Sequence, residues 1–187
     1  MDSLKKYQII YADPPWSYND KMKGTGFEIE KQYKTMNLES LKQLPIKEMS
    51  EDNSVLLMWF VYGMFPEALE LIKSWGFKYK TIAFIWNKKS KHGKSVYTMG
   101  RWTLSNTEAV ILATRGACNK YKKTNSMKQY VEAERTKHSK KPDIIKDKIV
   151  ELFGDIPRVE LFARQKTEGW DVWGNEVESD IVLETTP

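Results

Sequence analysis

The strongest constraint on the fold of this chain is a regular alternation of short apolar runs with helical patterns. The apolar runs are rich in branched and aromatic residues and too short for helices, so they are predicted to be buried strands, at 7–12, 54–60, 79–86, 108–114 and 158–163. Apolar residues at three- and four-residue spacing predict helices at 38–46, 66–75 and 142–153, and the last two begin with proline and are followed by glycine. This alternation predicts an α/β fold with a doubly wound, mostly parallel sheet that helices cover on both faces.

The first predicted strand ends in Asp13-Pro14-Pro15-Trp16, and ligands of open α/β sheets bind at the carboxyl ends of strands. An amine on a purine or pyrimidine ring is a poor nucleophile because its lone pair is delocalised into the ring. The carboxylate of Asp13 can accept one N–H of such an amine, and the carbonyl of Pro14 can accept the other. Both hydrogen bonds strengthen as charge builds on the nitrogen. The prolines fix the backbone, and Trp16 can stack on the ring.

The same four residues also allow a purely structural interpretation. A strand can end in a Pro-Pro turn, with Asp13 as a turn residue and Trp16 as a cover for the core. The functional interpretation carries a further requirement, because a base inside a duplex would have to be flipped out, or come from a single strand, to reach the carboxylate. The motif alone does not decide between the two.

Further motifs follow in a fixed order along the chain. They are Gln32 to Met36, Phe84-Ile85-Trp86, Gly100-Arg101-Trp102, Ser105 to Glu108, His138 to Asp143, Glu160 to Arg164, and Trp170 with Gly174-Asn175-Glu176. With Asp13 to Trp16, which would be catalytic, this series resembles the MT-A70 family of S-adenosylmethionine-dependent adenine-N6 methyltransferases, in its small bacterial and phage form, from about Tyr7 to Glu176. The resemblance implies a Rossmann-like class I methyltransferase fold and S-adenosyl-L-methionine as cofactor.

The order of the motifs implies a circular permutation, because the catalytic motif precedes Arg158–Arg164, the cofactor strand of the resemblance. No Gly-x-Gly-x-x-Gly is present. Lys141, before a helix, would meet the methionine carboxylate, and Asn175 and Glu176 would bind the ribose hydroxyls. The alternative for Arg164 and Asn175 is a surface ion pair and a turn. The full set implied for the cofactor is Asp13, Ile9, Ile10, Lys141, Glu160, Phe162, Arg164, Asn175 and Glu176.

Two departures from the family pattern bear on this cofactor site. Many relatives have a Pro-His-Asn type run after the arginine, whereas this chain has Gln165-Lys166-Thr167. Larger relatives also carry cofactor-contacting residues before the first strand, whereas six residues precede Tyr7 here. Backbone groups near Ile9 and Ile10 are therefore expected to contribute more to cofactor binding.

Positive charge is concentrated in two stretches of the chain. Residues 87–101 contain five lysines and arginines and no acidic residue, and residues 115–141 contain nine against two glutamates. The whole chain has a net charge of +5, so the remainder is net acidic. Because both stretches follow predicted strands, they are expected as basic loops that rim the catalytic end of the sheet and follow nucleic-acid phosphates. Solvated loops are the alternative.

The residues expected to bind the substrate fall into two groups. The resemblance places Tyr33, Trp86, Arg101, Trp102, Asn106 and Glu108 around the target base, and the charge pattern assigns Lys88, Lys89, Lys122, Lys123 and Arg135 to phosphates. Aspartate at the first motif position favours adenine over cytosine within the family. DNA is the preferred acceptor, since small solitary members are typical of bacteria and phages. RNA is an alternative acceptor, and a non-catalytic nucleic-acid-binding subunit of a methyltransferase heterodimer is an alternative role; the sequence is also compatible with a homodimer.

Length and composition fit one methyltransferase domain over residues 1–187. No apolar run approaches a membrane span, and the first residues lack a signal-peptide pattern, so a cytoplasmic protein is expected. Cys118 is the only cysteine, and His92 and His138 have no partner at metal-ligand spacing, so no metal site is expected. Direct methyl transfer between positioned reactants requires neither a metal nor a covalent intermediate.

Overall fold

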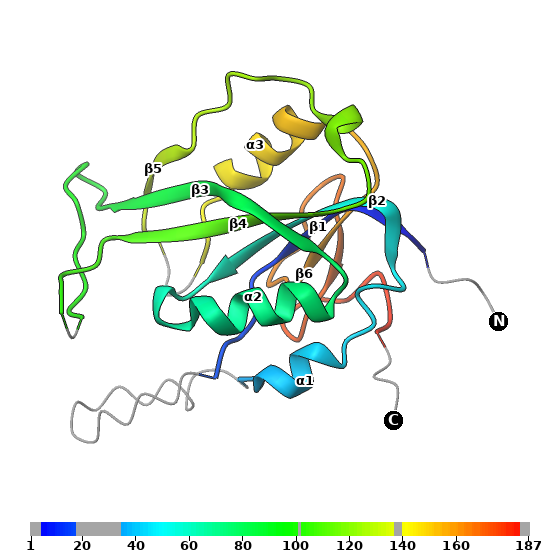
Figure 1. The fold of residues 1–187 in the computed structure, drawn as a ribbon. Coiled ribbons are helices and arrows are strands. Elements are labelled where there is room, and N and C mark those ends of the chain that lie inside the picture. Colours follow the sequence, from blue (N-terminus) through cyan, green and yellow to red (C-terminus); the bar gives the residue numbers. More distant parts are fainter. Residues whose placement is uncertain (1–4, 18–34, 101, 137–139, 184–187) are drawn as a thin grey trace.

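The computed structural model describes residues 5–17, 35–100, 102–136 and 140–183, which form one seven-stranded sheet with helices on both faces (Figure 1). The strands are β1 (Tyr7–Ala12), β2 (Ser50–Phe60), β3 (Lys78–Lys89), β4 (Thr107–Arg115), β5 (Tyr130–Glu134), β6 (Arg158–Leu161) and β7 (Asp171–Trp173). The helices are α1 (Leu38–Lys42), α2 (Phe65–Ser74) and α3 (Ile144–Phe153), with short 3-10 turns η2 (Tyr62–Met64) and η3 (Asn119–Tyr121). None of the helices in these residues is long and apolar enough to span a membrane.

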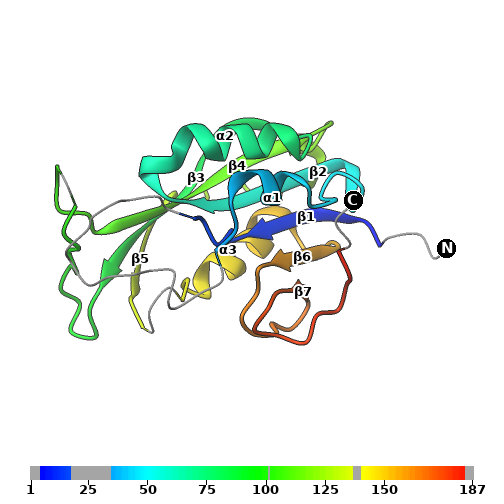
Figure 2. The same ribbon diagram turned by 90° about the horizontal axis from the view of Figure 1, so that it is seen from below.

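The sheet has the strand order β5-β3-β4-β2-β1-β6-β7. Only β4 runs against its neighbours, β2 and β3, and the other four pairings are parallel. The predicted Rossmann-like, mostly parallel α/β fold is confirmed. The strand of the Asp13 motif, β1, lies directly beside β6, the expected cofactor strand, although the two strands come from opposite ends of the chain (Figure 2).

Strand β1 is buried on both faces because helices cover each side of the sheet. Ile10 packs with α1 and α2 through a cluster that includes Leu41 and Leu71. Ile9 points the other way, into a cluster with Ile149 of α3. Figure 1 shows this layering, with α3 on one side of the sheet and α1 and α2 on the other. Two cores on opposite faces are what the alternating apolar pattern requires of a doubly wound sheet.

Several elements differ from the predicted ranges for local reasons. Helix α1 stops at Lys42 rather than at residue 46, because a residue before proline, here Leu44 before Pro45, disfavours the helical region. Strand β6 ends at Leu161 because Phe162 adopts a positive φ of 62°. The pattern missed β5 and β7. Strand β5 is a sheet-edge strand whose alternate residues are exposed, and β7 has only three residues.

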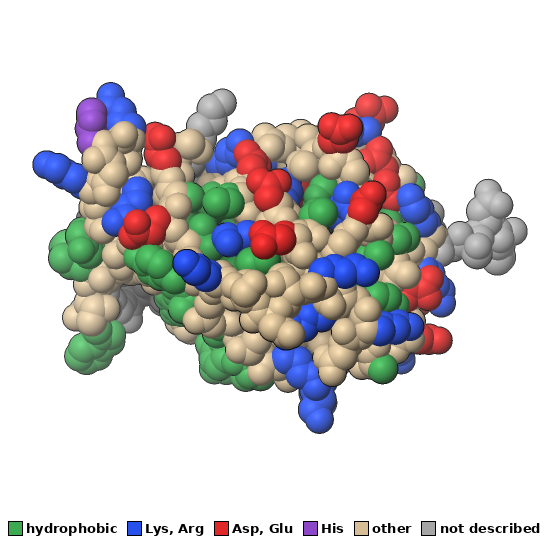
Figure 3. Space-filling view, turned by 90° about the horizontal axis from the view of Figure 1, so that it is seen from above, with side chains coloured by type: hydrophobic (Ala, Val, Ile, Leu, Met, Phe, Trp, Pro, Cys, Tyr) green, Lys and Arg blue, Asp and Glu red, His purple; other side chains and the backbone are tan. Residues whose placement is uncertain are grey.

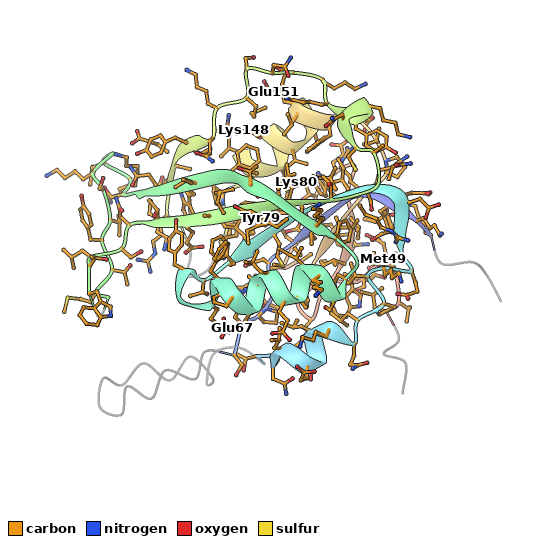
Figure 4. All side chains as sticks on the ribbon, viewed as in Figure 1. Met49, Glu67, Tyr79, Lys80, Lys148 and Glu151 are labelled. Carbon is orange, nitrogen blue, oxygen red and sulfur yellow. The ribbon has the colours of Figure 1, made fainter. Side chains whose placement is uncertain are left out.

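Replacing Ile149 by alanine is expected to lower the free energy of unfolding by about 2–5 kcal/mol, because the side chain is fully buried between α3 and the sheet. Urea denaturation measures the loss. Glu151→Ala on the outer side of the same helix (Figure 4) is the control and should change stability by less than about 0.5 kcal/mol. Equal losses in both variants would contradict the packing described for α3.

Candidate active site

The carboxyl ends of β1 and β6 lie where the connections of the sheet change direction. From β1 the chain continues through α1 to β2, whereas β6 is reached through α3 on the opposite face. Asp13 follows β1 directly, and its amide nitrogen lies 3.5 Å from the carbonyl oxygen of Leu161, the last residue of β6. Such a switch point is where open α/β sheets bind ligands.

Four charged side chains of alternating sign meet at this edge of the sheet. The Nζ of Lys141, which comes just before α3, lies 3.0 Å from Oδ2 of Asp13 and 3.3 Å from Oε2 of Glu108. The other carboxylate oxygen of Glu108, Oε1, lies 2.6 Å from Nζ of Lys88. We call these four residues the ionic cluster. It joins β1, β3, β4 and the start of the α3 segment, and all four of its residues were predicted to be site residues, with different functions.

Burial and neighbouring charges set the protonation states in the ionic cluster. Burial raises the pKa of the Asp13 carboxyl above its usual value, and the attraction of Lys141 offsets only part of this effect. Burial also acts on Glu108, but Lys141 and Lys88 outweigh it and lower the pKa of that carboxyl. For Lys141, burial opposes the charge, yet Asp13 and Glu108 prevail and raise the pKa of the amine. Lys141 is therefore a cation at neutral pH, and the pKa values of the two carboxyls are shifted in opposite directions.

The backbone of the Asp13 motif is fixed by its own hydrogen bonds. The carbonyl oxygen of Pro14 accepts the amide of Trp16 at 2.9 Å, and the carbonyl oxygen of Pro15 accepts the amide of Met36 at 2.9 Å. A carbonyl oxygen has two lone pairs, so Pro14 keeps one for a ligand.

The expected stacking role of Trp16 is wrong. Its side chain is only 8% exposed, packs in the core beneath α1 and α2, and approaches the Trp59 carbonyl through its indole nitrogen at 3.4 Å. The structural interpretation therefore holds for this one residue of the motif.

Two buried tryptophans underlie the cations of the ionic cluster. The Nζ of Lys141 lies 5.4 Å from the ring centre of Trp59, and the Nζ of Lys88 lies 5.7 Å from that of Trp86. The two rings meet edge to face at 6.3 Å. Trp86 is 2% exposed and donates its indole N–H to the carbonyl of Ala133, so it does not enclose a base as expected. Trp59 was not among the predicted site residues; its position at the carboxyl end of the second apolar run was the available signal.

A second group of predicted residues gathers at the carboxyl ends of β6 and β7. The side chain of Glu160 pairs with the Nζ of Lys146 at 2.5 Å, and Lys146 donates to the Thr167 hydroxyl at 2.7 Å. Burial raises the pKa of the Glu160 carboxyl even though Lys146 opposes it. Lys146 is a buried lysine that the sequence analysis did not single out. It ties α3 to the strand and loop at this end of the sheet.

The turns after β6 and β7 are packed closely enough to exclude any side chain at Gly174. A Cβ there would lie 2.1 Å from the carbonyl oxygen of Ala163. Phe162, strained at positive φ, packs edge to face on Trp173 at 5.3 Å. These contacts bring Arg164 within 3.7 Å of Glu176, and Asn175 is exposed beside it. Arg164 and Glu176 are thus brought together, and Phe162 and Asn175 lie in the same two turns.

Ile9 and Ile10 do not lie in this group. Both are fully buried in the middle of β1, whose backbone pairs with β2 on one side and with β6 on the other. Their N–H and C=O groups are used by the sheet. The expectation that this backbone compensates for a short N-terminal segment is therefore not supported.

The two basic stretches do not both rim the catalytic edge. Because β4 is antiparallel, the chain leaves it at the opposite edge of the sheet, where the amide of Lys123 donates to the carbonyl of Leu152 near the end of α3. Ten helical residues span about 15 Å, so Lys122 and Lys123 lie far from Asp13, which is near the other end of α3. The prediction that Lys122 and Lys123 rim the catalytic edge is therefore wrong. The chain returns through β5, so Arg135 does reach the catalytic edge, where its amide donates to the carbonyl of Lys89.

The remaining predicted substrate residues have separate positions. Lys89 pairs with Glu132 at 2.9 Å, and Asn106 donates to Asn87 at 3.0 Å. Trp102 is 95% exposed. Tyr33 and Arg101 lie outside the described residues.

Other reactive groups do not form a competing site in the described ranges. Cys118 is buried, and burial raises the pKa of its thiol, so it is not an activated nucleophile. No three histidine, cysteine, aspartate or glutamate side chains among the described residues come together as metal ligands.

Comparisons with known proteins cover nearly the whole chain. The MT-A70 family model matches residues 7–176. The Type II methyltransferase M.MunI of a Mycoplasma species is 35% identical over 92% of this chain and 78% of its own length. The human N(6)-adenine-specific methyltransferase METTL4 is 28% identical over 92% of this chain but 38% of its own length. A probable N(6)-adenosine-methyltransferase MT-A70-like protein of Oryza sativa subsp. japonica is 25% identical over 95% of this chain and 24% of its own length. This chain therefore spans less than half of the two larger relatives.

Replacing Lys141 by methionine is expected to lower the free energy of unfolding by about 1–3 kcal/mol at about pH 8, because Asp13 and Glu108 lose the cation that they share. The loss should shrink toward about pH 5. Without Lys141 the pKa of Asp13 rises further above that of the unfolded chain, and a carboxyl with a raised pKa destabilises the fold only as the pH rises past its unfolded value. Urea denaturation at both pH values measures the difference.

Lys140→Met is the matched control for this prediction. Lys140 is adjacent, more exposed, and paired with Asp143 rather than with the ionic cluster. A similar pH dependence in both variants would contradict the role given to Lys141.

Proposed function

The chain belongs to the MT-A70 family, and we propose on this basis that it transfers a methyl group from S-adenosyl-L-methionine to the N6 amine of adenine in nucleic acid, with DNA as the preferred acceptor. The observation that carries the proposal is the ionic cluster, which places Asp13 of the family motif in contact with Lys141 at the switch point of the sheet. Asp13 thus belongs to the family motif, lies at the switch point of the sheet and pairs with a cation.

Asp13 is the group proposed to act on the amine. Its side chain keeps 26% of its surface exposed, so a ligand can reach it. Its raised pKa makes the carboxylate a stronger hydrogen-bond acceptor than an ordinary aspartate. Accepting one N–H concentrates electron density on the amine nitrogen, and the free lone pair of the Pro14 carbonyl can accept the other N–H. Both interactions strengthen as the nitrogen becomes positively charged in the transition state.

Lys141 is proposed to hold Asp13 in its ionised form and in place. Its ammonium has three donors, two of which face Asp13 and Glu108. The third can meet the carboxylate of the cofactor. Glu108 and Lys88 add one negative and one positive charge to those of Asp13 and Lys141, so the ionic cluster as a whole is neutral.

The residues at the carboxyl ends of β6 and β7 carry functional groups that suit the parts of the cofactor. S-adenosyl-L-methionine supplies a methyl group on a positively charged sulfur, with a ribose, an adenine and an amino-acid end. Glu160, Asn175 and Glu176 offer acceptors for hydroxyl groups, and Phe162 offers an aromatic face. The close approach of Gly174 to Ala163 keeps the two turns together around these groups. We expect Arg164 to orient Glu176, which lies 3.7 Å away.

The preference for DNA rests on the similarity to the Type II methyltransferase M.MunI, of which this chain covers 78%. RNA is the second candidate acceptor, because a larger relative is named an adenosine methyltransferase. A non-catalytic role is disfavoured, because the chain keeps both Asp13, the proposed catalytic carboxylate, and Lys141, the cation that pairs with it.

The test of the proposal is incubation of the chain with methyl-tritiated S-adenosyl-L-methionine and duplex DNA, single-stranded DNA or RNA, followed by nucleoside mass spectrometry. We expect N6-methyldeoxyadenosine in DNA. N6-methyladenosine in RNA alone would transfer the proposal to RNA. Neither product with any acceptor would contradict the enzymatic function.

Asp13→Asn is expected to lower kcat at least about 100-fold, because a neutral amide stabilises the developing charge poorly. The dissociation constant for the cofactor, measured by isothermal titration calorimetry, should change much less. Asp147→Asn, at an exposed position of α3, is the control and should retain full activity. Full activity of Asp13→Asn would exclude the proposed role of the carboxylate.

A further inference from the structure

The loop between β3 and β4 carries four exposed large apolar side chains, including the two most exposed ones among the described residues. Trp102 is 95% exposed and Met99 87%, and Tyr97 and Leu104 are each 59% exposed. We call residues 90–100 and 102–106 the arm. It projects past the carboxyl end of β3, beyond the body of the sheet (Figure 1). Figure 3 shows hydrophobic groups gathered at this projecting end, with basic groups and a histidine beside them. Clustered exposed apolar groups mark an interaction site.

The arm is held by hydrogen bonds on both sides of its tip. The amide of Lys88 donates to the carbonyl of Asn106 at 2.9 Å, and the amide of Val96 donates to the carbonyl of Lys88 at 2.9 Å. Nearer the tip, Thr98 and Ser105 exchange two backbone hydrogen bonds of 2.7 and 2.9 Å. At the tip itself, a Cβ on Gly100 would lie 2.5 Å from the carbonyl oxygen of Thr103, so the turn is tight and only glycine fits it. These hydrogen bonds and the tight turn hold the backbone of the apolar tip in a defined conformation.

The base of the arm is connected to the proposed catalytic carboxylate. Lys88, where the arm leaves β3, pairs with Glu108 at 2.6 Å, and Glu108 shares Lys141 with Asp13. The tip that carries Trp102 therefore belongs to a loop that leaves and rejoins the sheet at the same edge as Asp13.

The charge of the arm favours a nucleic acid over a protein partner. The sequence from residue 90 to residue 106 contains Lys91, Lys94 and Arg101 and no acidic residue. A second copy of this chain carries a net charge of +5, so charge gives no overall attraction between two copies. A polyanion is attracted to the arm by its phosphates. The combination of basic flanks and an apolar tip is that of side chains that enter a base stack.

Building on the proposed function, we propose that the arm engages duplex DNA and inserts Trp102, with Met99 beside it, into the stack as the target adenine leaves it. An adenine in a duplex cannot reach Asp13 without leaving its base pair, and the gap that it leaves exposes the neighbouring bases to water. An indole ring can cover those bases by stacking. A single strand has no such gap, so the tip matters for duplexes alone.

The test compares Trp102→Ala with the wild-type chain on a paired target adenine and on the same adenine in a single strand. We expect kcat/KM on the paired duplex to fall about tenfold or more, and to change less than about threefold on the single strand. Trp102→Phe should restore most of the activity. Val182→Ala removes another exposed apolar side chain, away from the arm, and should have no effect.

A second measurement separates this proposal from the proposed function. With 2-aminopurine at the target position, base flipping raises fluorescence without any methyl transfer, and Trp102→Ala should reduce that rise and weaken duplex binding. Equal losses on paired and single-stranded substrates would overturn the insertion of Trp102. So would unchanged fluorescence with a shift from dimer to monomer in sedimentation, which would identify the arm as a protein interface. A chain that flips the base but methylates no acceptor would refute the proposed function and leave the arm supported.

Discussion

The sharing of Lys141 between Asp13 and Glu108 is the interaction on which the site depends. Two carboxylates at one sheet edge repel each other and lose hydration there, and a single ammonium lying between them compensates for both effects. The pair also fixes the start of the α3 segment against β1 and β4. Because α3 packs its other end next to the beginning of β6, the same contact helps to set the position of the proposed cofactor residues relative to Asp13.

The direction of β4 decides how charge is distributed over the molecule. A parallel β4 would have carried the second basic stretch to the catalytic edge. The antiparallel strand instead carries its first part to the opposite edge, and β5 brings the chain back only near Arg135. The basic residues next to the site are therefore those of the β3–β4 arm and of the segment around Arg135. This asymmetry favours an acceptor that approaches from the side of the arm.

The exposure of the tryptophan side chains is the property that the sequence pattern predicted least well. Trp16, Trp59, Trp86 and Trp102 all lie near the catalytic end of the chain's strands, and the sequence offered no means of telling their exposures apart. Trp16 and Trp86 are in the core, Trp59 supports Lys141, and Trp102 is almost fully exposed. Burial of an aromatic ring depends on which helix or strand covers it. That information lies in contacts between distant segments.

By itself, the sequence determined the strand and helix alternation, the Asp13 motif, the family and the permuted order of its parts, because these follow from local periodicity and from short motifs read in order. The tertiary structure decided which edge each loop reaches, which charged groups pair, and which aromatic rings are free. Lys146 and Glu160, or Lys88 and Glu108, are distant in sequence, and their pairing appears only once strand order and direction are known. Strand direction is a property of the whole sheet, and no single segment encodes it.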